Sequence, residues 1–97
     1  MEYKSVVVIY GSDSSEWEVS VKSGEFTASQ IDGSRYDVYE MFARFGQWHL
    51  VAYRKKGQER VVIPADERPA IDKSDFSVML DGEKVKFPYN TYDNPVV

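Results

Sequence analysis

Alternating and continuous apolar runs predict a strand-rich chain. Residues 3–10 are β-branched or aromatic on both alternating faces, a pattern typical of a central strand covered on both sides. Residues 16–22 alternate strictly, with the apolar positions from Trp17 to Val21 on one face, as in a strand with one solvated face. The polar loop 11–15 between these segments predicts a first hairpin, 3–10/16–22.

A second hairpin is expected in the middle of the chain. Residues 48–55 are again apolar on both faces, which predicts another central strand. Gly57-Gln58 fits a type II′ turn, and residues 60–64 then return as the partner strand, which Pro64 ends.

The third hairpin has the strongest local signal in the sequence. Asp81-Gly82 is the dipeptide that type I′ hairpin turns favour, and it separates residues 76–80 from residues 83–87. A two-residue loop places Val78 opposite Val85 on the apolar face of this hairpin.

The segment 34–45 fits both a helix and a strand. Its first residues have the spacing of a capping box with aspartate in place of glutamate, and Glu40 and Arg44 would form an i,i+4 ion pair. Gly46 stands where a left-handed C-cap belongs, so a helix is favoured. Alternate residues of the same segment are also apolar, however, and Gly46-Gln47 fits a two-residue hairpin turn.

The expected architecture is therefore α+β. An antiparallel sheet of about six strands in three hairpins would carry one helix, 34–45, on one face. In the alternative, an all-β roll or small barrel, residues 36–45 are a strand. The chain length fits a single domain, 1–97. Residues 88–97 are expected to form a C-terminal arm or tail, either docked on the core or covering a sheet edge in the same subunit or a neighbouring one.

Composition excludes several kinds of site. The absence of cysteine excludes disulfides, thiolate zinc sites and cysteine nucleophiles. The single histidine, His49, lies in a predicted central strand, which favours a structural role over that of a general base. Scattered glycines form no phosphate-binding loop. We therefore expect no catalytic residue, metal or cofactor. No apolar run matches a signal peptide or membrane span, so we expect a cytoplasmic protein that does not bind membranes.

Charge is concentrated at one predicted hairpin tip. The chain has a net charge of −4, and the stretch 54–60 alone has a net charge of +3. The net charge of the remaining residues is therefore −7. The cations of the stretch 54–60 are Arg54, Lys55, Lys56 and Arg60. An anionic partner, either nucleic acid or a phosphate ligand, is the function that this tip indicates.

A surplus of tyrosine indicates a different function, which we favour. Tyrosine is enriched at protein interfaces, and the candidate contact residues are Tyr36, Tyr39, Tyr89 and Tyr92. An acidic chain of this size without a recognisable catalytic motif suggests a non-catalytic protein-binding module, such as an inhibitor, an immunity or antidote protein, or an assembly subunit. Its expected partner is another protein, with a homodimer through the C-terminal arm or a sheet edge as a further expectation.

Overall fold

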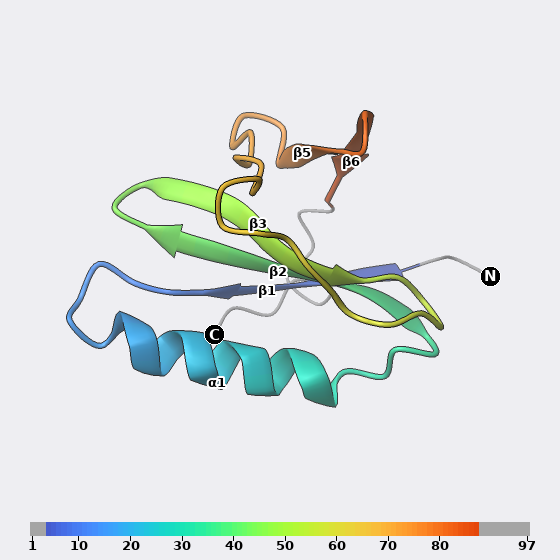
Figure 1. The fold of residues 1–97 in the computed structure, drawn as a ribbon, viewed down its shortest axis with the longest axis horizontal. Helices are drawn as coiled ribbons and strands as arrows, with labels where there is room; N and C mark the ends of the chain where they lie inside the picture. Colours follow the sequence, from blue (N-terminus) through green and yellow to red (C-terminus); the bar gives the residue numbers. More distant parts are fainter. Residues whose placement is uncertain (1–3, 88–97) are drawn as a thin grey trace.

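The chain folds into one helix and two sheets in the computed structural model, which describes residues 4–87 (Figure 1). The elements are, in order, β1 (Lys4–Tyr10), α1 (Trp17–Gln30), β2 (Tyr36–Arg44), β3 (Gln47–Arg54), β4 (Val61–Val62), β5 (Ser77–Leu80) and β6 (Glu83–Lys86). The larger sheet has the strand order β1-β2-β3-β4, and β5 pairs with β6 in a separate two-stranded sheet. The α+β class is confirmed, but the arrangement differs from three hairpins around one antiparallel sheet.

The first hairpin prediction is wrong, because residues 16–22 belong to α1. β1 pairs with β2 in parallel, and α1 is the crossover between them. Trp17 and Val21 lie on the same helical stripe as the buried Gly24 and Ala28, whereas Val19 is 59% exposed. Trp17 and Val21 are four residues apart, a spacing that fits both the two-residue period of a strand and one turn of a helix. The alternation over residues 16–22 is therefore also the beginning of a longer helical pattern.

Close packing of α1 on β1 depends on Gly24. A Cβ atom at this position would overlap the ring of Tyr10, so only glycine lets the helix approach the strand at this distance. Tyr10 is 2% exposed beneath the helix.

The helix prediction for residues 34–45 is also wrong. This segment is β2, which pairs along its length with β1 on one side and β3 on the other. Most of β2 is buried, because α1 covers one face of the sheet and the chain after β4 covers the other. The turn to β3 has positive φ angles at Phe45 (52°) and Gly46 (76°), so Gly46 serves a hairpin turn and not a helix C-cap.

The second hairpin is confirmed in its strand pairing. β3 and β4 are antiparallel, with Tyr53 opposite Val61, although β4 has only two residues. The turn differs from the expected type: the Gln58 N–H donates to the Lys55 carbonyl (2.8 Å) and Gly57 has a φ of 74°. Gly57 is thus the third residue of the turn, the position at which type II turns require glycine.

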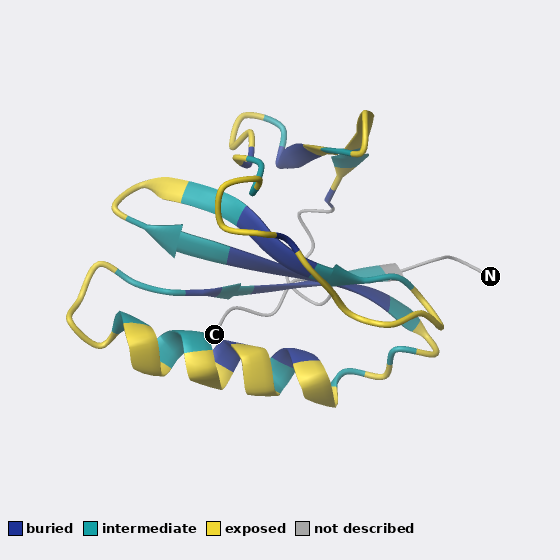
Figure 2. Cartoon of the chain, viewed as in Figure 1, coloured by how far each residue is buried: buried dark blue, intermediate teal, exposed yellow. Residues whose placement is uncertain are grey.

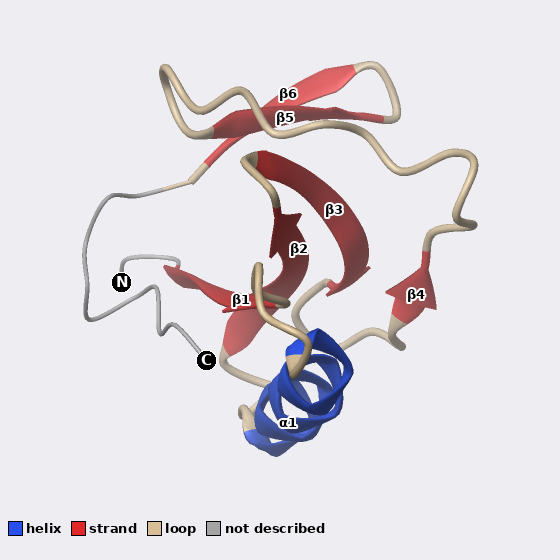
Figure 3. Cartoon of the chain, turned by 90° about the vertical axis from the view of Figure 1, so that its left-hand side faces the viewer, coloured by secondary structure: helices blue, strands red, loops and turns tan. Residues whose placement is uncertain are grey.

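The third hairpin is confirmed in both its turn and its register. Val78 lies opposite Val85, and the turn residues Asp81 and Gly82 have φ angles of 52° and 80°. The hairpin does not extend the larger sheet. It packs on the face opposite α1, so the larger sheet lies between helix and hairpin (Figure 3).

Two apolar clusters hold these layers together, and buried positions lie along the strands of the larger sheet (Figure 2). The buried residues on the helix side are Val6, Val8, Tyr10, Ala28 and Val38. Those on the hairpin side are Val7, Tyr39, Met41, Leu50, Ile63, Ile71, Phe76, Val78 and Phe87. Within residues 4–87, no helix is long and apolar enough to cross a membrane.

Candidate functional site

The loop that joins β1 to α1, residues 11–16, lies at the carboxyl end of a parallel strand. Ligands of open α/β sheets bind at this end, where loops leave the strands. The loop begins at Gly11, whose φ of 102° and closeness to the sheet both require glycine. A Cβ atom there would lie 2.6 Å from the Ala43 carbonyl oxygen.

The loop is held by the turn between β2 and β3. The Phe45 N–H donates to the Asp13 carboxylate (2.5 Å), and Arg44 Nε donates to the Ser12 carbonyl (3.0 Å). The Arg44 guanidinium also lies 4.9 Å from the ring centroid of Trp17 and 4.4 Å from that of Phe45. These contacts fix the loop conformation without a ligand, which is the condition for a preformed site.

Glu16 ends the loop with an exposed carboxylate. Its N–H donates to Ser14 Oγ (3.1 Å), and its carbonyl accepts from the N–H groups of Val19 and Ser20 at the start of α1. The residue is exposed, and no hydrogen bond or ion pair among residues 4–87 engages its carboxylate. The loop therefore presents one negative group, on a fixed backbone, that can bind a cation such as an ammonium group.

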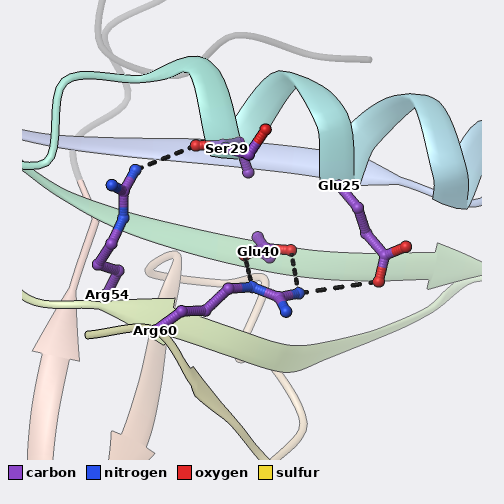
Figure 4. Close-up of a pocket in the computed structure, with 6 residues that line it drawn as sticks. Glu25, Ser29, Glu40, Arg54 and Arg60 are labelled. Carbon is purple, nitrogen blue, oxygen red and sulfur yellow. Dashed lines mark hydrogen bonds and ion pairs between the residues drawn. The ribbon is translucent and has the colours of Figure 1, made fainter.

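A second candidate is a charged cavity of about 400 Å³ between α1 and the sheet (Figure 4). One of the residues that line it is Glu40, whose carboxylate on β2 is only 2% exposed. Arg60 binds it with two hydrogen bonds, from Nε (2.7 Å) and from a terminal nitrogen (2.8 Å), and the Tyr10 hydroxyl donates a third (3.1 Å). The charge of Glu40 is therefore compensated within the protein.

The remaining charged groups of the cavity also have protein partners. One terminal nitrogen of Arg54 donates to the carbonyls of Ala28 (3.1 Å) and Ile31 (2.8 Å), at the carboxyl end of α1. The helix dipole stabilises a cation at this end. Glu25 lies 3.7 Å from Arg60. This arrangement joins helix to sheet, so we regard the cavity as a structural ion-pair network.

Two pKa values reflect this network. Burial, followed by the nearby Glu40 carboxylate, raises the pKa of Tyr10 above its usual value, because both disfavour the phenolate. The hydrogen bond to Glu40 raises the pKa of Arg60.

The predicted basic tip is divided between the two faces of the sheet. Arg54 and Arg60 line the cavity beside α1. Lys55 lies on the other face, where its Nζ is 3.2 Å from the Tyr39 hydroxyl and 3.9 Å from the Asp37 carboxylate. The backbone N–H of Lys56 donates to the same aspartate. Anion binding by these four residues stays a prediction.

The predicted tyrosine surface is also divided. Tyr36 is half-buried on the helix side, with Arg35 5.6 Å from its ring centroid. Tyr39 is 3% exposed in the hairpin-side cluster, between Tyr53 and Phe87. The other two candidates, Tyr89 and Tyr92, lie outside the described residues. A partner-binding role for these tyrosines stays a prediction.

Two features bear on chemistry elsewhere in the chain. The half-buried His49 forms an isolated bridge with Ala70 and lines a shallow cavity with Phe42 and Arg68. Over the part of the chain that the structure describes, no group of three or more histidine or acidic side chains is arranged to hold a metal ion.

Comparison with known proteins identifies a class of relatives. No family model matches the chain. It is 33% identical over 86 residues to a D-alanine–D-alanine ligase of Phocaeicola vulgatus, covering 89% of this chain and 23% of that protein. It is 31% identical to the D-alanine–D-alanine ligase of Oceanobacillus iheyensis, covering 88% of this chain and 28% of that protein. The chain thus spans about a quarter of the length of these curated relatives.

These relatives correct the functional expectation. Most of this chain is similar to part of a ligase. This similarity contradicts the expected non-catalytic binding module of inhibitor, immunity or assembly type. It also contradicts the alternative, a nucleic-acid or phosphate binder. The expectation of a chain unconnected with catalysis is wrong for the same reason. Sequence reasoning missed the loop 11–16, which it had placed inside a hairpin. The available signal was a glycine directly after an apolar strand, followed five residues later by an acidic residue opening a segment with helical spacing.

Proposed function

We propose that this chain supplies one part of a ligase that joins D-alanine to D-alanine. The observation that carries the proposal is the similarity to D-alanine–D-alanine ligases along 89% of the chain. The β1–α1–β2 unit agrees with it, because such units present a loop to small ligands at the carboxyl end of the first strand. A cytoplasmic location belongs to the same proposal.

Within this part, we assign Glu16 to the ammonium group of a D-alanine molecule. An amino-acid substrate carries one cation, and a carboxylate bound to it must be accessible and not already paired. Asp13 is nearby, but its carboxylate accepts the Phe45 N–H and fixes the turn. Glu16 lies on the same rigid loop with its carboxylate unengaged by the described residues.

A chimera tests the proposal. The 86 matched residues of the Phocaeicola vulgatus ligase are replaced by the corresponding residues of this chain, and D-alanyl-D-alanine formation is measured under conditions in which the parent is active. We expect product formation within about tenfold of the parent rate, equivalent to about 1.4 kcal/mol in the barrier. As a control, the chimera with Gly11→Val should be inactive, because a side chain there overlaps the Ala43 carbonyl.

The melting temperature separates misfolding from lack of function. A chimera that melts as cooperatively as the parent but forms no product would overturn the proposal. Activity that persists in the Gly11→Val chimera would instead remove the loop from the site.

A further inference from the structure

Arg44 contacts the chain on both sides of Glu16. Its Nε donates to the Ser12 carbonyl in the loop 11–16 (3.0 Å). Its guanidinium lies 4.9 Å from the ring centroid of Trp17, the residue that directly follows Glu16 and begins α1. Arg44 is itself the last residue of β2, which pairs with both β1 and β3. The side chain therefore fixes the loop to the sheet before and after the residue that we assign to the ammonium group.

Phe45 contacts Arg44 from a strained backbone conformation. Its φ of 52° lies in the left-handed region, which phenylalanine rarely adopts. The residue is also 65% exposed, so burial of its ring compensates for little of this strain. Its ring centroid lies 4.4 Å from the Arg44 guanidinium, and its N–H donates to the Asp13 carboxylate in the loop. Strained residues are concentrated at functional sites, and the contacts of Phe45 point to this one.

The contact leaves the Glu16 carboxylate available. Among residues 4–87, Arg44 forms no ion pair with Glu16, although both belong to the surroundings of the same loop. Arginine suits this position because its planar guanidinium stacks on aromatic rings while its Nε donates a hydrogen bond. The ammonium group of lysine cannot make both contacts in the same geometry.

We propose that Arg44 is a positioning residue for Glu16 and is itself held by the Phe45 ring. The inference rests on the proposed function, in which Glu16 binds the ammonium group of D-alanine. A loop that is already ordered loses less conformational entropy when its ligand binds. Arg44 acts through the loop and does not touch the substrate. Its removal therefore weakens D-alanine binding and raises KM, with little effect on kcat.

Kinetics of the chimeric ligase test this role. Arg44→Met keeps much of the apolar stem, and it should raise KM for D-alanine about tenfold with kcat within about twofold. Phe45→Asn keeps the N–H bonded to Asp13 and suits the positive φ, so KM should rise about threefold without a lower melting temperature. Arg35→Met is the matched control, because Arg35 lies 5.6 Å from the ring centroid of Tyr36 at the opposite end of β2.

A double-substitution cycle separates positioning from direct contact with the substrate. In the chimera that already carries Glu16→Gln, Arg44→Met should change kcat/KM by less than about twofold, because no charged group remains to be positioned. An equal effect of Arg44→Met with and without Glu16→Gln would show that Arg44 acts independently of Glu16. That result would overturn the proposal.

NMR relaxation of the whole chain separates failure of this inference from failure of the proposed function, because it needs no enzymatic activity. Backbone order parameters of residues 14–16 should be about 0.85 in the wild type and in Arg35→Met, and below about 0.6 in Arg44→Met. Unchanged order parameters in Arg44→Met would overturn the inference whatever the chimera does. An inactive chimera together with a loosened loop would overturn the proposed function and support the positioning of the loop by Arg44.

Discussion

Replacing Arg60 with methionine should strongly destabilise the fold. Methionine retains much of the apolar stem of arginine. Among the side chains of residues 4–87 it leaves the 2%-exposed Glu40 carboxylate with one hydrogen-bond donor, the Tyr10 hydroxyl. Two short charge-assisted hydrogen bonds are removed, at 2.7 and 2.8 Å.

The magnitude follows from the burial of the pair. Breaking a buried ion pair by removing one partner costs about 3–5 kcal/mol, because the other charge stays buried. The Arg60 side chain is 40% exposed, so water can reach Glu40 after the substitution, and we expect the lower end, about 3 kcal/mol. For a chain of this size the melting temperature should fall by about 15 °C.

Urea unfolding of three variants measures this effect. Arg60→Met should lower the free energy of unfolding by about 3 kcal/mol. Adding Glu40→Gln to this variant should restore at least about 1 kcal/mol, because burying a neutral amide costs less free energy than burying a charge. Glu25→Gln is the matched control. Its contact with Arg60 is 3.7 Å long between groups that are 48% and 40% exposed, so the change should stay within about 0.5 kcal/mol. A loss below about 1 kcal/mol for Arg60→Met, or no recovery in the double variant, would refute the reasoning.

Three further predictions concern packing, pH and turn geometry. Gly24→Ala should destabilise the chain by about 2–3 kcal/mol, since the new methyl group overlaps the Tyr10 ring, whereas Ser23→Ala on the exposed side of α1 should change the free energy of unfolding by less than about 0.5 kcal/mol in the same urea assay. The pKa of Tyr10 is raised in the folded state, first by burial and then by Glu40, so its contribution to stability is complete below about pH 10 and is lost as the pH rises further, because the unfolded chain releases this proton first. The melting temperature is measured between about pH 9.5 and 11, a range around the usual tyrosine pKa. It should fall less steeply with pH in Tyr10→Phe than in the wild type. Equal slopes would show that Tyr10 does not cause this loss of stability. Phe45→Asn should raise the free energy of unfolding by about 0.5–1 kcal/mol, because Phe45 has a φ of 52° that asparagine adopts more readily, and a loss of stability would show that the ring contact with Arg44 outweighs this strain.

Local turn chemistry predicted only the parts of the fold that depend on local contacts. The Asp81-Gly82 turn and the Val78–Val85 register follow from two residues and their neighbours, and both are confirmed. The pairing of β3 with β4 was predicted from neighbouring segments for the same reason. These elements need no information from distant parts of the chain.

The two wrong elements depend on long-range pairing. Residues 17–21 alternate, but the helical stripe becomes visible only when the window extends to Gly24 and Ala28. The segment that became β2 has local helix signals, including the Glu40–Arg44 spacing, yet Glu40 is buried against Arg60, twenty residues away. Tertiary contacts there outweighed local propensity.

The candidate site was missed as a consequence of the wrong topology. In a hairpin, residues 11–15 are a simple connection, whereas between a parallel strand and a helix they form a ligand-facing loop. The contacts that fix this loop, from Arg44 and Phe45, come from a turn more than thirty residues away and have no signature in the local sequence.

The role of Glu16 is tested most directly in the chimeric ligase. kcat/KM for D-alanine is measured for the chimera and for its Glu16→Gln and Glu18→Gln variants; Glu18 is an exposed acid in the first turn of α1 and serves as the control. Loss of a charged hydrogen bond to the substrate ammonium, worth about 1.5–3 kcal/mol, predicts a decrease of about 10–100-fold for Glu16→Gln and less than about twofold for Glu18→Gln. Equal values for the two variants, with unchanged melting temperatures, would contradict the assignment of the loop as a D-alanine site.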